Sequence, residues 1–143
     1  MTGYGAPMFT MPIRPRYMEV DQQGVVFNGW YLTWFDEAMA AFLQERGLPY
    51  QSMLDAGFDV QVVRTEIDFK AGVRWRDEVA VAVSTGRIGT TSFALDFQVR
   101  RGEEVCCAAR TVYVVMAADF SGKRPIPPLL ADVLGEPAPL LPH

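Results

Sequence analysis

One acid stands out in the sequence because of its surroundings. Asp21 begins the polar turn DQQG (21–24), directly before a long run of aromatic and apolar residues with helical spacing. A carboxylate at this place lies close to the positive end of the helix dipole and to backbone amides that have no partner within the helix. Asp21 is therefore a candidate for chemistry, although capping a turn or helix is a common use of the same residue type.

The chain offers no internal histidine and only two cysteines. The single histidine, His143, is the last residue, where packing and hydrogen bonds rarely hold a ring in place. Cys106 and Cys107 are neighbours in a predicted strand and point to opposite faces, which suits packing better than a disulfide or a metal site. Chemistry that needs an ordered imidazole is therefore disfavoured. The groups that remain available for chemistry are carboxylates, hydroxyls and backbone amides.

Composition excludes several classes of partner. The 143 residues suit one domain with one core, and 13 basic against 17 acidic residues give a net charge of -4 without a basic run. Nucleic acid is thus not an expected partner. No apolar stretch approaches the ~20 residues that cross a bilayer, and the start MTGYGAPMFT lacks the pattern of a signal peptide. We expect a cytoplasmic protein without a membrane partner.

Periodicity predicts one long helix within an otherwise extended chain. The helix runs over residues 29–46 and ends at the Gly47 and Pro49 signals. Its apolar residues cover nearly the whole circumference, which predicts a buried helix with one exposed polar strip at Glu37. A short helix is predicted at 128–134. Extended segments are predicted at 12–20, 60–69, 78–88, 92–101 and 105–117, with a hairpin at Gly102.

This order predicts an α+β fold in which an antiparallel sheet of about five strands curls around one long central helix. The folded domain spans residues 12–134. Residues 1–11 are expected to form a flexible N-terminus, and residues 135–143 a mobile Pro-rich tail.

The helix entry carries a specific motif, in which a first strand runs into Asp-x-x-Gly-hydrophobic-Val and then into the long helix. Together with the segments 47–49, 63–69, 77–79 and 121–125, it resembles the hotdog-fold acyl-CoA thioesterases of the 4-hydroxybenzoyl-CoA thioesterase type, over about residues 13–134. Three positions depart from that pattern: Asn28 stands where many members have His, Trp30 where they have Asn, and Ala71 where Pro is frequent. The matching residues at the helix entry are Glu19, Asp21, Gly24, Val25, Val26, Tyr31, Leu32, Phe35 and Ala38.

The resemblance implies a hotdog thioesterase domain that hydrolyses an acyl-CoA thioester to free acid and CoA. It implies no metal or redox cofactor, because coenzyme A belongs to the substrate. Since hotdog proteins pair and place their sites between subunits, it also implies a homodimer or a dimer of dimers. An uncovered edge strand in the single chain points the same way.

Asp21 and the amide near Asn28 are the expected catalytic groups. Backbone N–H groups at the helix start would stabilise the negative charge that grows on the thioester oxygen, by about 3 kcal/mol. Asp21 would act either as general base on water or as a nucleophile that forms a mixed anhydride, and the sequence leaves both open. Asn28 could equally be a helix cap, whatever the activity.

Further residues are expected to contact the substrate. The resemblance places Asp36 opposite the acyl group, although a solvated helix face is the usual explanation of such a charge. It places the nucleotide of CoA near the turn of Arg87, where ordinary surface charge is the alternative. The expected substrate-binding residues are Gly24, Val26, Phe27, Tyr31, Asp36, Arg87, Thr90, Thr91 and Ser92.

Two other functions compete with hydrolysis. A hotdog hydratase or dehydratase would need an internal histidine beside its acid, and the sequence has none. A non-catalytic acyl-CoA binding protein is compatible with the departures at Asn28 and Trp30, but the presence of Asp21 argues against it.

Overall fold

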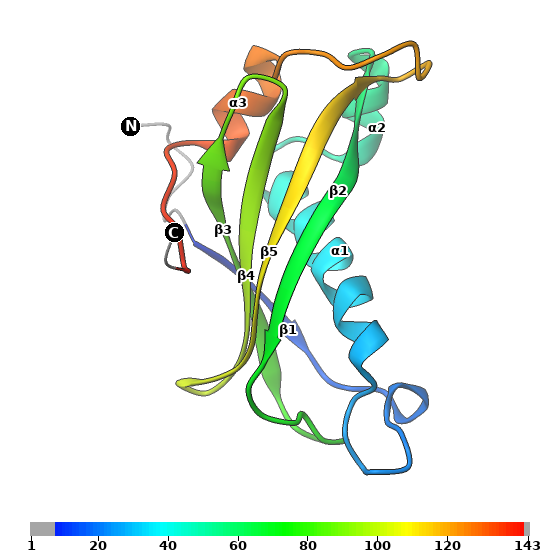
Figure 1. The fold of residues 1–143 in the computed structure, drawn as a ribbon, viewed down its shortest axis with the longest axis vertical. Helices are drawn as coiled ribbons and strands as arrows, with labels where there is room; N and C mark the ends of the chain where they lie inside the picture. The colour runs from blue at the N-terminus through cyan, green and yellow to red at the C-terminus, as the bar shows by residue number, and fades with distance from the viewer. Residues whose placement is uncertain (1–7, 142–143) are drawn as a thin grey trace.

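A computed structural model describes residues 8–141, so His143 lies outside the described residues. Within them, five strands form one antiparallel sheet in the order β1-β3-β4-β5-β2, with β1 and β2 at its edges (Figure 1). The elements are β1 (Phe9–Ile13), the 3₁₀ turn η1 (Tyr17–Glu19), α1 (Asn28–Glu45), α2 (Tyr50–Asp55), β2 (Phe58–Phe69), β3 (Val79–Ile88), β4 (Ser92–Arg101), β5 (Glu104–Ala117) and α3 (Pro128–Leu134).

The predicted α+β architecture is confirmed, with differences at the first strand and after the long helix. The extended segment predicted at 12–20 instead contains β1, which starts at Phe9, and then η1. Pro12 is tolerated because β1 is an edge strand. The short helix α2 was not predicted, since six residues carry too little periodicity. No helix within residues 8–141 is long and apolar enough to cross a membrane.

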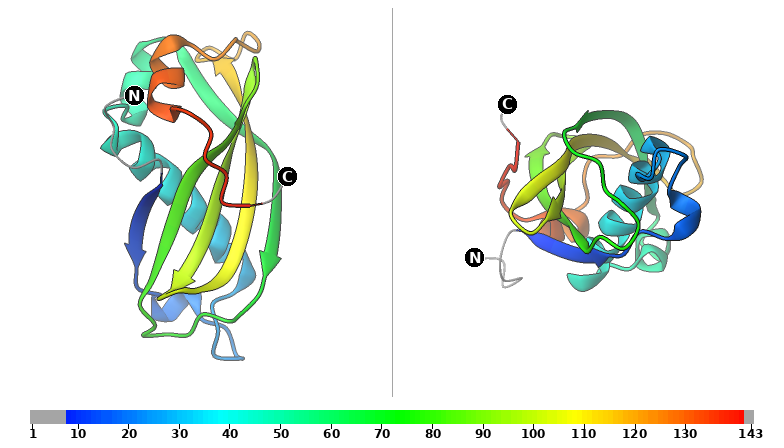
Figure 2. Two further views of the ribbon diagram at one scale, coloured as in Figure 1. Left: turned by 90° about the vertical axis from the view of Figure 1, so that its left-hand side faces the viewer. Right: turned by 90° about the horizontal axis from the view of Figure 1, so that it is seen from below.

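α1 lies across the concave face of the sheet, which curls around it when the molecule is viewed along its length (Figure 2). The Phe35 ring stacks on Phe97 of β4 with ring centroids 4.8 Å apart. Trp34 and Phe42 are buried on the same side of the helix. The predicted burial is confirmed for this side of the helix only, because Leu32 is 50% exposed and Asp36 is also exposed. The sheet ends at β2 and leaves this second side of α1 uncovered.

The convex face of the sheet is covered in part by the C-terminal segment, which runs along β3 and β4 (Figure 2). The expected mobile tail is instead hydrogen-bonded over residues 135–141: Ala138 donates to the Thr85 carbonyl at 2.8 Å, and Leu140 donates to Asp96 at 2.9 Å. Asp96 is fully buried and also pairs with Arg110 at 2.7 Å. The tail is held because it completes the hydrogen bonding of this buried carboxylate.

Asp96→Asn should therefore destabilise the protein. The substitution removes a buried charge that Arg110 and the tail amides share, and breaking such a pair costs about 3 kcal/mol or more. Urea unfolding followed by circular dichroism measures the loss. Asp68→Asn, at an exposed acid on β2, is the matched control and should change the free energy of unfolding by less than about 0.5 kcal/mol. Equal losses of unfolding free energy in both variants would contradict the role of Asp96 as the buried anchor of the tail.

Candidate active site

Asp21 closes its own turn and keeps part of its carboxylate available. Its N–H donates to the Val25 carbonyl at 2.9 Å, and its carbonyl accepts from Gly24 at 3.0 Å. One carboxylate oxygen, Oδ1, accepts the Gln23 N–H at 2.8 Å, while Oδ2 accepts no hydrogen bond from residues 8–141. The side chain is half-buried. Asp21 thus serves as a turn cap through one oxygen and has the other free for a reaction.

The start of α1 presents two unpaired backbone amides next to this turn. Phe27 is the N-cap residue, and its side chain offers no capping hydrogen bond. Trp30 N–H donates to the Phe27 carbonyl at 3.0 Å. Asn28 and Gly29 come before it in the first turn, and nothing in the described part of the chain accepts their N–H groups. The cap role considered for Asn28 is wrong, since Asn28 is the first residue of the helix.

A second loop, residues 70–78, supports the turn from one side. Val26 N–H donates to the Val73 carbonyl at 2.7 Å, and Val25 forms a bridge with Arg74. The Arg101 guanidinium forms an ion pair with Asp77 of this loop at 2.6 Å. The Arg74 amide, together with Arg101, holds the pKa of the Asp77 carboxyl below its usual range. The turn before α1 is thereby tied to the sheet.

A groove between α1 and β2 leads away from these amides along the helix. Its first cavity, of about 300 Å³, begins at Leu32, one helical turn beyond Asn28. Its second, of about 310 Å³, reaches α2, where Tyr50 donates to Asp59 at 2.8 Å. Asp36 lines both cavities. The first cavity is lined by Leu32, Phe35, Asp36, Val62, Thr65, Thr111 and Tyr113, and the second by Asp36, Met39, Ala40, Leu43, Leu48, Tyr50, Met53, Asp59 and Val60.

The groove contains two tyrosine hydroxyls with raised pKa values, Tyr50 bonded to Asp59 in the second cavity and Tyr113 in the first. Burial raises the pKa of Tyr113 well above its usual range, and the negative charge of Asp36 raises it further. Tyr113 and Asp36 both line the first cavity. The first cavity combines an apolar wall with hydroxyl groups from Thr65, Thr111 and Tyr113 and one carboxylate.

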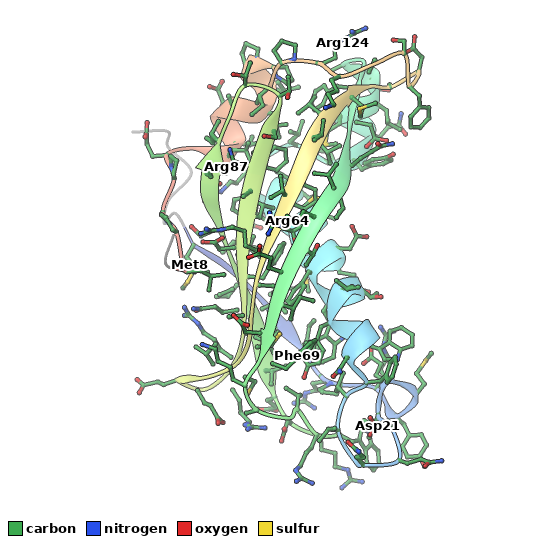
Figure 3. All side chains as sticks on the ribbon, viewed as in Figure 1. Met8, Asp21, Arg64, Phe69, Arg87 and Arg124 are labelled. Carbon is green, nitrogen blue, oxygen red and sulfur yellow. The ribbon has the colours of Figure 1, made fainter. Side chains whose placement is uncertain are left out.

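The structure brings together some of the predicted residues and separates others. Asp21 lies at one end of the molecule (Figure 3). Gly24 is hydrogen-bonded to it, and Phe27 and Asn28 follow in the same loop and at the start of α1, where Phe27 is 57% exposed. Val26 and Tyr31 lie at the same end but are buried in the core. Burial raises the pKa of Tyr31 to about 12. These two residues support the site from within.

The predicted nucleotide turn lies far from Asp21. Arg87 is located towards the opposite end of the elongated chain (Figure 3). Arg87 and Thr90 are exposed, while Thr91 and Ser92 are half-buried. The Thr91 carbonyl accepts the Val115 N–H at 2.9 Å, so that part of this turn anchors the hairpin. Within a single chain, the Arg87 turn and Asp21 therefore do not form one site.

Sequence reasoning missed the β2 and β5 residues of the groove, above all Val62, Thr65 and Tyr113. Their only signal is the alternation of side chains along each strand, which identifies the inward face but not the cavity on it. Within residues 8–141, no three His, Cys, Asp or Glu side chains cluster as metal ligands would.

Comparison with known proteins decides the family. The sequence profile of the thioesterase superfamily matches residues 23–114. The chain belongs to the thioesterase superfamily. The predicted enzyme class, a thioester hydrolase, is thereby confirmed.

The similar proteins span most of the chain. A putative esterase from Aquifex aeolicus is 25% identical over 103 residues, which are 72% of this chain and 80% of the relative. The structure of a 1,4-dihydroxy-2-naphthoyl-CoA thioesterase from Synechocystis superposes with a TM-score of 0.80 at 23% identity, over 89% of this chain and 95% of the other. A gentisyl-coenzyme A thioesterase structure superposes with a TM-score of 0.80 at 24% identity, over 89% of this chain and 100% of the other. The predicted hotdog fold is confirmed.

The Asp21 turn depends on a left-handed residue, because Gly24 has a φ of 81°. Gly24→Ala should lower the free energy of unfolding by about 1–2 kcal/mol, since a Cβ is unfavourable in this conformation. Gly24→Asn is the matched control, because Asn tolerates the left-handed region better and should recover part of the loss. Urea unfolding of the three proteins tests the order. Equal stability of wild type and Gly24→Ala would show that the turn adapts without strain.

Proposed function

We propose that the protein hydrolyses an acyl-CoA thioester with Asp21 as the reacting acid and the amides of Asn28 and Gly29 as donors to the thioester oxygen. The observation that carries this proposal is the pair of unpaired N–H groups at the start of α1, together with a carboxylate that has one free oxygen in the turn leading into this helix. Both N–H groups belong to the positive end of an 18-residue helix, which favours negative charge at that point.

The reaction needs only groups of this chain and water. In the first route, Asp21 takes a proton from a water molecule while the oxygen attacks the thioester carbon. In the second, the Asp21 carboxylate attacks and forms a mixed anhydride, which water then hydrolyses. In both, the tetrahedral oxyanion collapses and expels the CoA thiolate, which takes up a proton. The two amides would stabilise the oxyanion by about 3 kcal/mol.

The acyl group is proposed to extend into the groove between α1 and β2. The first cavity begins at Leu32, one turn beyond the donor amides, and is mostly apolar. Asp36 at its far end would accept a hydrogen bond from a hydroxyl on the acyl group. The names of two similar proteins fit this choice, because 1,4-dihydroxy-2-naphthoyl and gentisyl groups are hydroxylated aromatic acyl groups. We therefore propose a hydroxylated aromatic acyl-CoA as substrate.

Pairing of two chains is proposed to complete the site. β2 is an edge strand, and Val62 and Val63 on it are 56% and 58% exposed. Two β2 edges paired antiparallel around a two-fold axis would place the Arg87 end of one chain beside the Asp21 end of its partner. This arrangement explains how Arg87 and residues 90–92 could bind the CoA nucleotide. A homodimer, alone or within a dimer of dimers, is the proposed assembly.

The role of Asp21 is tested by thiol release from a panel of acyl-CoAs. Asp21→Asn should lower kcat at least about 100-fold, because it removes the base or nucleophile while leaving the amide donors in place. Glu45→Gln, at an exposed acid on the same helix, is the control and should retain wild-type activity. Undiminished turnover by Asp21→Asn would reduce Asp21 to a turn cap. Binding of acyl-CoA without hydrolysis by the wild type would refute the enzymatic proposal.

The role of Asp36 is tested by comparing two substrates that differ in one hydroxyl. Asp36→Asn should lower kcat/KM for 4-hydroxybenzoyl-CoA about tenfold or more, because it weakens a hydrogen bond to a charged group, and should leave benzoyl-CoA little changed. Glu37→Gln is the matched control, since Glu37 is the adjacent acid and lines no part of the groove between α1 and β2. An equal effect of Asp36→Asn on both substrates would exclude hydroxyl recognition.

A further inference from the structure

Glu19 is a buried acid directly before the reacting turn. Its side chain is 1% exposed, although it lies two residues before Asp21 and close to the surface loops of the site. A buried carboxylate without hydrogen bonds would be strongly unfavourable. The contacts that satisfy Glu19 therefore reveal what it holds in place.

The carboxylate joins two separate elements. Oε1 accepts the backbone N–H of Arg16 at 2.7 Å, which fixes the 3₁₀ turn η1. Oε2 accepts the indole N–H of Trp34 at 3.0 Å, and Trp34 belongs to α1. The Arg16 guanidinium lies 3.5 Å from the same oxygen and is largely exposed. Both oxygens are thus engaged, one by the turn before Asp21 and one by the helix after it.

The main chain of Glu19 closes the loop that carries Asp21. The Glu19 carbonyl accepts the N–H of Phe27 at 2.8 Å. Phe27 is the N-cap residue of α1, immediately before the amides of Asn28 and Gly29. Val20 and Val26, the next pair of residues towards the Asp21 turn, form a β-bridge. The chain therefore leaves Glu19, makes the Asp21 turn and returns to Glu19.

We propose that Glu19 is a positioning residue, which sets the placement of the Asp21 carboxylate relative to the Asn28 and Gly29 amides. This inference rests on the proposed function of those groups. Glu19 is too buried to contact substrate, and it acts through Phe27 on one side and Trp34 on the other. Misplacement of a reacting group by about 1 Å can lower a rate about 100-fold, so a small rotation of the loop would be measurable in kcat.

The first test compares kcat and KM of graded variants. Glu19→Gln keeps one acceptor oxygen and should lower kcat about tenfold, whereas Glu19→Ala keeps none and should lower it about 100-fold, both with KM within about twofold. Trp34→Phe should also lower kcat. Because Glu19 and Trp34 act through one hydrogen bond, the double variant Glu19→Gln/Trp34→Phe should lose less than the product of the single losses.

A matched control separates positioning from general destabilisation. Asp96→Asn also removes a buried, hydrogen-bonded charge, but on the convex face of the sheet, away from the groove. It should lower the stability to urea without lowering kcat at a temperature where both variants are folded. A loss of kcat in Asp96→Asn that equals the loss in Glu19→Gln would overturn the positioning role. So would an unchanged kcat in both Glu19 variants.

A second measurement is independent of turnover. In ¹H–¹⁵N spectra, Glu19→Gln should shift or broaden the amide signals of Asp21, Asn28 and Gly29, and Asp96→Asn should leave them in place. Unchanged signals in Glu19→Gln would refute the inference even if the protein hydrolyses acyl-CoA. Shifted signals in a protein that hydrolyses no acyl-CoA would support the positioning geometry and refute the proposed function. The positioning role of Glu19 and the proposed hydrolysis can therefore be refuted independently of each other.

Discussion

The packing of one face of α1 on the curled sheet is the constraint on which the site depends. The Phe35 and Phe97 rings, 4.8 Å apart, and the buried Trp34 fix both the rotation and the height of the helix over β4. Because an α-helix is rigid over its first turns, this packing also fixes where the amides of Asn28 and Gly29 point. The end of the helix that carries the proposed donors is placed by aromatic contacts one to two turns further along the chain.

The other face of α1 remains uncovered for a related reason. The five strands end at β2, so the sheet is too narrow to enclose the whole helix. Leu32 and Asp36 therefore border a groove, and the β2 edge beside it exposes Val62 and Val63. One geometric fact, an open edge next to the helix, produces both the cavity proposed for the acyl group and the apolar edge proposed to pair with a second chain.

Much of this fold could be predicted from the sequence, and the failures have physical causes. The strand at Ser92–Arg101 is predicted to the residue because its alternation is regular and its inner face is fully covered. The buried helix face, by contrast, could not be separated from the exposed one, since Leu32 and Ala40 are apolar on the open side. The Pro-rich composition of the tail predicts mobility. Its hydrogen bonds leave no local signal, because their acceptor Asp96 is on a strand about 40 residues earlier.

The same limit applies to the candidate site. Asp21 and Asn28 are close in sequence and belong to one local motif. Arg87 lies towards the other end of the molecule (Figure 3), and no local pattern could reveal the proposed pairing of two chains. The departure at Asn28 from the family's usual histidine has a simple consequence. The proposed donors are main-chain N–H groups, which any residue except proline supplies. Substitution of the side chain therefore leaves the donors unchanged, and what must be preserved is the placement of the helix start, through Phe27 and the buried carboxylate of Glu19.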